Sequence, residues 1–243
     1  MRYLVLADIH ANLQALDAVL ADAAARGYDR VLLLGDLVGY GANPIETIDR
    51  TMALDPAAVI RGNHDKVCAG LEPATDFNDA ARASAEWTAA ILPVSHRDLL
   101  AALPAGPVSV TDALQICHGA PFDEDYYVFD LDDAAQALDA VTARVCLFGH
   151  THVPAAYASA EDPIRARDAA GTDLILPASS SLVNVGSVGQ PRDGDSRAAY
   201  GILDLDRDSL QLCRVAYDIA GAQARIRDAG LPEWLAVRLG QGH

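Results

Sequence analysis

Short apolar runs alternate with segments of helical periodicity in the opening part of the chain. Residues Tyr3–Ala7 form a continuous apolar run, which is typical of a strand buried on both faces. In Asn12–Arg26, leucine and valine recur at helical spacing, and Gly27 follows as a helix stop. The alternation continues with a strand, a helix and a strand at Arg30–Leu34, Pro44–Leu54 and Ala57–Ile60. This β-α-β-α-β order predicts parallel strands with helices packed on a face of the sheet.

The rest of the chain has a different pattern of apolar and polar residues, which predicts short strands in place of most of the helices. Residues Asp76–Leu103 show a helical pattern that is interrupted near Pro93. The predicted strands that follow are Val108–Val110, Leu114–Cys117, Val145–Phe148, Ala155–Ala158, Leu174–Leu176, Leu182–Val185, Ala199–Leu205 and Leu210–Val215. Two helices are predicted near the end, over Tyr217–Ala229 and Pro232–Leu239. Neither a linker nor a repeat interrupts the pattern, so we expect residues 1–243 to form one domain with two sheets.

Polar residues follow the predicted strands at five places, and these places hold five of the seven histidines. The segments are Asp8-Ile-His10, Gly35-Asp36, Arg61-Gly-Asn63-His64-Asp65, His118-Gly119 and Gly149-His150-Thr-His152. In open α/β sheets, ligands bind just beyond the carboxyl ends of the strands. We therefore expect these side chains to converge on one pocket.

Each of these segments on its own is weak evidence for a site. A single histidine at a strand end is usually a structural residue, and an isolated Gly-Asp pair is usually a turn. Several polar segments in the same position relative to their strands are hard to explain by structure alone. The residue types also agree with one another, because Asp, His and Asn side chains suit Mn, Fe, Zn, Co or Ni. No thiolate accompanies them, so a closed structural zinc site is not expected.

The number of polar side chains matches a pair of metal ions. Two divalent ions about 3.5–4 Å apart need a bridging carboxylate and about three further ligands each. The strand-end segments supply that number with Asp8, His10, Asp36, Asn63, His118, His150 and His152. His64 is then left over, and its acidic neighbour Asp65 can orient it. A spare histidine in such a pocket is a candidate general acid for a leaving alkoxide.

Composition and charge narrow the expected partners and the compartment. The net charge is −16, and Lys66 is the one lysine. So negative a surface repels nucleic-acid phosphates at long range, and no stable nucleic-acid partner is expected. The four cysteines are scattered, which is typical of reduced thiols. The apolar runs are too short for a signal peptide or for a membrane span of roughly 18 residues. We therefore expect a soluble, cytoplasmic protein without a membrane partner.

The ordered set of segments resembles the calcineurin-like metallophosphoesterases, especially their small single-domain prokaryotic members. The motifs of that family are D-x-H, G-D, G-N-H-D/E, a histidine before glycine, and G-H-x-H. All of them occur here in that order between residues 8 and 152, and the similarity continues through residues 185–192. The resemblance implies an α/β fold, namely a four-layer α/β/β/α sandwich of two mixed sheets with the site above the strand ends.

The resemblance also implies a role for each polar residue. One ion would be held by Asp8, His10, Asp36 and His152, and the other by Asp36, Asn63, His118 and His150, with Asp36 bridging. Manganese is the first choice of metal, with iron, zinc, nickel or cobalt as alternatives. A bridging hydroxide would attack phosphorus in line, while His64 protonates the leaving oxygen and Asp65 fixes its tautomer. Asn63 would also contact the substrate, where it meets the charge that develops on the phosphoryl oxygens.

Several residues near these motifs keep two interpretations each. Asn12 either hydrogen-bonds to groups in the site, as part of the substrate-binding set, or caps the first helix. Arg192 either contacts a substrate phosphate or forms a surface ion pair. Tyr40 either stacks on a base or lines its loop. The acidic, aromatic segment 122–133 is either a lid that sets substrate choice or a solvated loop with packed aromatic residues.

The function expected from these residues is metal-dependent hydrolysis of a small phosphomonoester or phosphodiester, either nucleotide-like or a metabolite. Other hydrolase classes fit less well. His152 is followed by Val-Pro, which breaks the H-x-H-x-D-H pattern of metallo-β-lactamases, and no G-x-x-x-x-G-K-[ST] nucleotide loop is present. The alternative from another class is a catalytically idle interaction scaffold on the same fold, as the retromer complex uses. A decayed site should have lost ligands, whereas this sequence keeps all of them.

Overall fold

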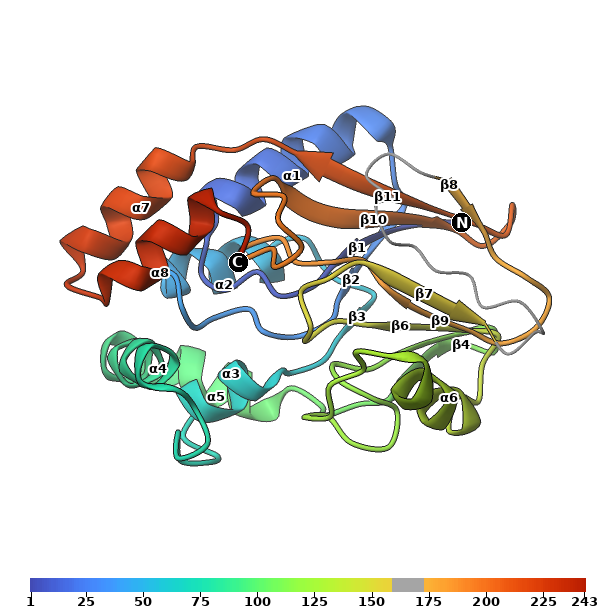
Figure 1. The fold of residues 1–243 in the computed structure, drawn as a ribbon, viewed down its shortest axis with the longest axis horizontal. Coiled ribbons are helices and arrows are strands. Elements are labelled where there is room, and N and C mark those ends of the chain that lie inside the picture. Colours follow the sequence, from blue (N-terminus) through green and yellow to red (C-terminus); the bar gives the residue numbers. More distant parts are fainter. Residues whose placement is uncertain (159–172) are drawn as a thin grey trace.

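Two β-sheets lie face to face in this protein, with helices on both outer sides (Figure 1). The computed structural model describes residues 1–158 and 173–243. The first sheet has the strand order β3 (Ala58–Val59), β2 (Arg30–Leu33), β1 (Arg2–Leu6), β10 (Ala198–Asp204), β11 (Ser209–Val215) and β8 (Asp173–Ile175). Strands β1, β2 and β3 run parallel, and the remaining pairs of this sheet are antiparallel.

The second sheet also mixes parallel and antiparallel strands. Its order is β4 (Val108–Thr111), β5 (Leu114–Ile116), β6 (Val145–Phe148), β9 (Ser181–Asn184) and β7 (Ala155–Ala158). The three central strands run parallel, and each edge strand is antiparallel to its neighbour. Two mixed sheets were the expected arrangement, and the structure confirms it.

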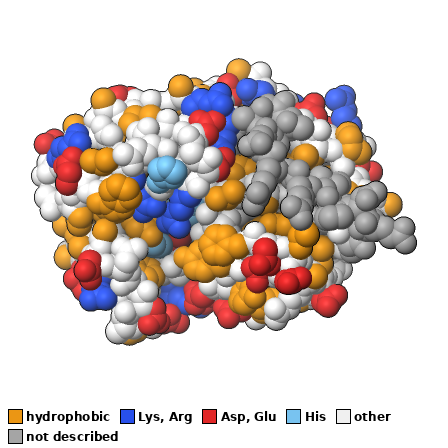
Figure 2. Space-filling model, in the orientation of Figure 1, with side chains coloured by type: hydrophobic (Ala, Val, Ile, Leu, Met, Phe, Trp, Pro, Cys, Tyr) orange, Lys and Arg blue, Asp and Glu red, His pale blue; other side chains and the backbone are white. Residues whose placement is uncertain are grey.

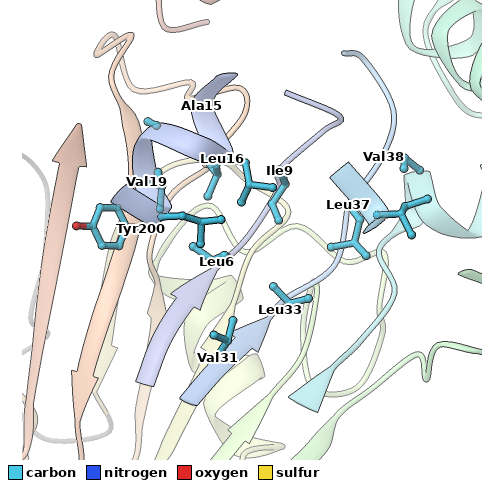
Figure 3. Close-up of a cluster of buried hydrophobic side chains, with 14 of the residues drawn as sticks. Leu6, Ile9, Ala15, Leu16, Val19, Val31, Leu33, Leu37, Val38 and Tyr200 are labelled. Carbon is cyan, nitrogen blue, oxygen red and sulfur yellow. The ribbon is translucent and has the colours of Figure 1, made fainter. Parts of the chain in front are cut away.

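Helices on the two outer faces complete a four-layer α/β/β/α sandwich. They are α1 (Leu13–Arg26), α2 (Pro44–Met52), α3 (Asn63–Cys68), α4 (Asp79–Ile91), α5 (Val94–Ala102), α6 (Leu131–Asp139), α7 (Ile219–Asp228) and α8 (Glu233–Val237), followed by a 3₁₀ turn at Arg238–Gly240. On the first sheet, Leu16 and Val19 of α1 point toward Leu6 of β1 (Figure 3). On the second sheet, Ala137 of α6 packs in one cluster with Phe148 of β6.

The innermost layer of side chains joins the two sheets. Val5 and Leu32 of the first sheet pack in one cluster with Leu147 and Val183 of the second, and all four are completely buried. Burying one such side chain contributes about 1.5–3 kcal/mol. Because successive residues of a strand point to opposite faces, β1 sends Val5 to the partner sheet and Leu6 to α1. Burial on both faces explains why this strand is a continuous apolar run.

Most predicted elements are present, but the sequence analysis missed helices α3 and α6. Helix α6 carries a usable start signal, because the Asp130 carboxylate accepts hydrogen bonds from the backbone N–H groups of Asp132 and Asp133. The last residues of the acidic segment 122–133 are therefore the first turn of a helix. Within the described parts of the chain, no helix is long and apolar enough to cross a membrane.

Candidate metal centre

The loops that follow the parallel strands bring the predicted site residues to one edge of the sandwich. Asp8 and His10 follow β1, and Asp36 follows β2. Asn63, the first residue of α3, lies just beyond β3. From the second sheet, His118 follows β5, and His150 and His152 follow β6. Segments that are far apart in the sequence therefore supply one pocket.

Two groups of possible ligand atoms share Asp36. One group is Asp8, His10, Asp36 and His152, and the other is Asp36, His118 and His150; within each group the atoms lie within 4.8 Å of one another. Asn63 joins the second group, since its Oδ1 is 3.4 Å from His118 Nε2. Nε2 of His10 and Nε2 of His118 each lie 3.5 Å from Asp36 Oδ2. All seven predicted ligands thus meet, and Asp36 occupies the position expected of a bridging carboxylate.

A backbone carbonyl orients each of the four histidine rings in these groups. The contacts are His10 Nδ1 with Val38 O at 3.0 Å, His118 Nδ1 with Leu34 O at 2.8 Å, His152 Nδ1 with Gln190 O at 2.6 Å, and His150 Nε2 with Asp125 O at 3.1 Å. A carbonyl oxygen only accepts, so the ring nitrogen that faces it carries the hydrogen. The other nitrogen of each ring is left to face the cluster, as in histidines that bind metals.

The backbone is strained where these ligands are attached. Asp8, His10, Asp36, His150 and His152 have φ values of 53°, 51°, 52°, 68° and 61°. Residues other than glycine seldom adopt this left-handed conformation, which costs on the order of 1–3 kcal/mol each and clusters at functional sites. Backbone hydrogen bonds hold the strained loops together, for example from His10 N to Asp36 O at 2.9 Å.

Two motif glycines make room for the ligands. Gly35 has a φ of 89°, and a Cβ at this position would lie 2.8 Å from His118 Nδ1. A Cβ at Gly62 would lie 2.2 Å from Asp36 Oδ1 and 2.6 Å from Asp36 N. All three distances are below any normal contact of a Cβ, so the glycine in each of these motifs is required by the close approach of a ligand.

Burial and mutual charge set the protonation of the site. Burial lowers the pKa of His10, His150 and His152, in the case of His150 to about 3, so these rings are neutral at neutral pH. Burial also acts on His118, but the Asp36 carboxylate outweighs it and raises the pKa of His118 to about 10. Metal binding would have to displace that proton, whereas the three neutral rings are already in the form that binds metals.

His64 lies in an aromatic box beside the first group. Its ring centroid is 4.4 Å from that of Tyr40, 4.5 Å from that of Phe77 and 4.9 Å from that of His10. Its backbone N–H donates to Asp36 Oδ1 at 2.9 Å. Burial lowers the pKa of the His64 ring to about 4. Within the described residues, His64 Nδ1 is buried without a hydrogen-bond partner.

Asp65 does not orient His64, so this part of the prediction is wrong. Its Oδ1 accepts a hydrogen bond from Val38 N at 3.1 Å, and its Oδ2 accepts one from Gly62 N at 3.0 Å. Both carboxylate oxygens are therefore engaged with backbone groups of two site loops. The contacts assign Asp65 to holding the loop after β2 against the start of α3.

Of the two interpretations of Asn12, the structure supports the helix cap. Its Oδ1 accepts from Ala15 N at 3.1 Å, at the start of α1. Its Nδ2 donates to Gly189 O at 2.8 Å and so ties the first loop to the loop after β9. Both ends of the amide are satisfied by the protein, which leaves Asn12 in a supporting position rather than at the substrate.

Arg192 lies beside the metal groups and forms no ion pair with an Asp or Glu in the described chain, so the surface-ion-pair interpretation is wrong. Its backbone N–H donates to His152 O at 3.3 Å. Its Nη2 donates to Gln190 Oε1 at 3.0 Å and to the Tyr40 hydroxyl at 3.3 Å. The guanidinium is thus held near the first group, with its charge available to an anion.

Part of the acidic segment 122–133 covers His150, which the sequence analysis missed. The Tyr127 ring stacks on the His150 ring with centroids 3.7 Å apart, and Phe129 stacks on Tyr127 at 5.1 Å. Asp125 supplies the carbonyl oxygen that orients His150. The segment therefore forms one wall of the second group, while its packed aromatic residues Tyr127 and Phe129 remain 41% and 63% exposed.

Two basic residues fasten that segment to α3 and its preceding loop. Arg61 Nη2 lies 2.9 Å from Glu124 Oε1, and Lys66 Nζ lies 3.4 Å from the same oxygen. Lys66, whose side chain is only 3% exposed, also pairs with Asp125 and Glu72. The one signal of these ion pairs in the sequence was Lys66 itself, because it is the single lysine and directly follows the G-N-H-D motif.

Comparisons with known proteins identify the family and agree with the observed fold. The family model for the calcineurin-like phosphoesterase superfamily domain matches residues 1–208. An uncharacterised protein of Methanocaldococcus jannaschii is 34% identical over 238 residues, which cover 97% of this chain and 96% of that protein. The crystal structure of a metallophosphoesterase from Sphaerobacter thermophilus is similar with a TM-score of 0.90 and 37% identity over the whole of both chains. A hypothetical protein from Pyrococcus horikoshii shares the fold with a TM-score of 0.80 and 22% identity, over 100% of this chain and 98% of that one.

Proposed function

The chain belongs to the calcineurin-like phosphoesterase superfamily, and from this premise we propose that it is a hydrolase of small phosphomonoesters or phosphodiesters that depends on two divalent metal ions. The observation that carries the proposal is the pair of ligand groups that share Asp36. Residues 1–243 would act as one catalytic domain. Manganese is our first choice of metal, and iron, zinc, nickel and cobalt are compatible with the same ligands.

The residues of the site fit a pair of cations. With Nδ1 of His10 and of His152 donating to carbonyl groups, their two Nε2 lone pairs face each other at 3.0 Å. The Asp36 carboxylate lies in the same pocket as Asp8, where burial and the charge of Asp36 raise the pKa of Asp8 to about 7. Facing lone pairs and neighbouring carboxylates repel one another, and a bound cation turns both contacts into attractions.

When bound, the two ions would supply an activated water and neutralise charge on the phosphoryl group. The chain's own residues would do the rest. Asn63 would donate an N–H group to the phosphoryl oxygens at the metals as charge develops on them, and Arg192 would contact a phosphate group of the substrate. His64 would give a proton to the leaving oxygen, and an anionic phosphate next to its ring favours the protonated form. Tyr127 and Asp125 would keep the His150 ring in place.

The overall charge of the protein favours a small substrate over a nucleic acid. The net charge of −16 repels an extended polyanion at long range, whereas one phosphate group meets only the local charge of the site. We therefore propose a small phosphorylated metabolite or nucleotide as the substrate.

The test is an assay of metal-stripped protein reloaded with Mn²⁺, using p-nitrophenyl phosphate and bis-p-nitrophenyl phosphate. We expect turnover that requires the metal and is abolished in Asp36→Asn, and a loss of about 10²–10⁴-fold in kcat for His64→Ala. The exposed Asp17→Asn is the matched control and should behave like the parent protein. The ratio of the two substrates distinguishes monoester from diester preference. Absence of turnover with every divalent metal would reject the enzyme in favour of an interaction scaffold.

A further inference from the structure

Two arginines lie over the ring of Tyr40, which in turn contacts the rings of His10 and His64. Their guanidinium carbons, on Arg192 and Arg238, each lie 5.6 Å from the centroid of that ring. Figure 2 shows Lys and Arg side chains near the middle of one face of the molecule, with hydrophobic side chains beside them. Arg238 is far in the sequence from every metal motif, and no local pattern of residues singles it out.

The C-terminal helices hold Arg238 in this position. Leu235 and Leu239, on either side of Arg238, are buried in one cluster with Tyr40 and with Ile226 of α7. The guanidinium also lies 6.0 Å from the ring of Trp234, and its Nε donates to the main-chain oxygen of His243. Packing therefore fixes the direction of the Arg238 side chain.

Among the described residues, no acidic side chain balances the two guanidinium groups, and the Nε of Arg238 bonds to the main-chain oxygen of His243, the last residue of the sequence. In the described parts of the chain, neither arginine forms an ion pair with Asp or Glu, although the protein has 34 acidic and only 18 basic residues. Burial lowers the pKa of Arg238 to about 10, and the nearby charge of Arg192 contributes to the same effect. Two like charges held together in this way repel each other until an anion lies between them.

The arginines lie next to the metal groups rather than on a separate face. The Tyr40 ring, which both of them contact, is 4.7 Å from the His10 ring and 4.4 Å from the His64 ring. The backbone N–H of Arg192 also donates to the carbonyl oxygen of His152. An anion bound by the two arginines would thus belong to the same ligand as a phosphoryl group on the metals.

We propose that Arg192, Arg238 and Tyr40 form a subsite for a second phosphoryl group of the substrate. Guanidinium groups offer planar pairs of N–H donors that match phosphoryl oxygens, and the Tyr40 hydroxyl adds a third donor. This inference rests on the proposed phosphoesterase function and makes it more specific. The substrate class is a small molecule with two phosphoryl groups, one held at the metals and the other at Tyr40.

The test compares inhibitors of p-nitrophenyl phosphate turnover by the Mn²⁺-loaded protein. Inorganic phosphate occupies one position, whereas pyrophosphate and fructose 1,6-bisphosphate carry two phosphoryl groups, linked directly or separated by a sugar. We expect a bisphosphorylated inhibitor to bind more tightly than phosphate, and Arg238→Gln to reduce that advantage by about ten- to a hundredfold. Whichever of the two inhibitors loses its advantage in Arg238→Gln indicates the distance between the two phosphoryl groups of the substrate. The exposed Arg207→Gln, which removes the same charge, should keep the advantage.

Two further variants show whether Arg238→Gln acts by removing a phosphate contact or only by disturbing the structure. Arg192→Gln should reduce the same advantage, and Arg238→Lys, which keeps the charge but loses the planar fork, should reduce it less. Circular dichroism reports whether each variant is folded. Equal weakening of phosphate and both bisphosphorylated inhibitors in Arg238→Gln and Arg192→Gln would overturn the subsite, as would no change at all.

If the protein turns over neither p-nitrophenyl ester, the proposed function has failed, and the subsite is tested by calorimetry instead. Pyrophosphate and fructose 1,6-bisphosphate are titrated into the parent protein and into Arg238→Gln with Mn²⁺ in excess. Binding of either compound by the parent that Arg238→Gln weakens by about tenfold or more would support the subsite. Equal binding to both proteins, or binding to neither, would overturn it.

Discussion

The two halves of the candidate metal centre are held in different ways. In the half formed by Asp8, His10 and His152, the ring nitrogens bond to carbonyl groups of strand-end loops, and every side chain is at most 2% exposed. In the other half, the His150 ring is oriented by Asp125 and covered by Tyr127, which is itself 41% exposed. The first half is part of the core. In the second half His118 is equally buried, but His150 depends on a surface segment. The second half should therefore be the one that changes without unfolding the protein.

We expect the largest effect from Gly62→Ala, because this substitution disturbs both halves of the centre at once. The added Cβ would lie 2.2 Å from Asp36 Oδ1, so either the carboxylate shared by the two groups or the loop before α3 must move. We expect a loss of about 1–3 kcal/mol in the free energy of unfolding, together with loss of bound metal. Denaturant unfolding and elemental analysis measure the two quantities. In the control Gly240→Ala, the nearest atom is 3.6 Å away, and both quantities should stay close to those of the parent. Equal behaviour of the two variants would mean that the backbone at Asp36 is free to relax.

We expect a smaller effect from Lys66→Met, which should change one half of the centre and leave the other as it is. This change removes the buried cation that pairs with Glu72, Glu124 and Asp125, and so loosens the segment whose carbonyl group orients His150. We expect the affinity for one Mn²⁺ ion to fall by about 10- to 100-fold and that for the other to remain, as for other partners of metal-bound histidines. Calorimetric titration of metal-stripped protein resolves the two binding events. Arg50→Met, which removes an exposed cation on α2, is the control. A parallel loss at both ions would show that the halves are not independent.

The smallest effect concerns the aromatic cover of His150. Tyr127→Leu removes a ring stacked at 3.7 Å but keeps an apolar side chain. Such stacking contributes about 0.5–1.5 kcal/mol. We therefore expect the affinity for the Mn²⁺ ion beside His150 to fall by roughly two- to tenfold. Phe129→Leu should matter less, because the Phe129 ring stacks on Tyr127 and is 63% exposed. If Phe129→Leu has the larger effect, the cover acts through the conformation of the whole segment rather than through the ring on His150.

Much of the fold and of the site could be predicted because the signals are local. The apolar run at β1 and the helical spacing in α1 reflect residues close in sequence, and both elements are present. The polar residues after the strands converge as expected, since parallel strands end at the same edge of a sheet. The start of α6 was also local, in the Asp130 cap, and was overlooked because its first acidic residues were assigned to the segment 122–133.

What the sequence by itself determined is which residues meet at the candidate centre, since these residues follow the ends of only five strands. The tertiary structure alone decided how they are oriented and what surrounds them. Asp65 lies next to His64 in the sequence, yet its carboxylate bonds to Val38 and Gly62. Arg192 and Arg238 meet at Tyr40 only because the C-terminal helices pack against the loop after β2. Such contacts join segments far apart in the chain, and their free energy depends on packing that no local pattern of residues records.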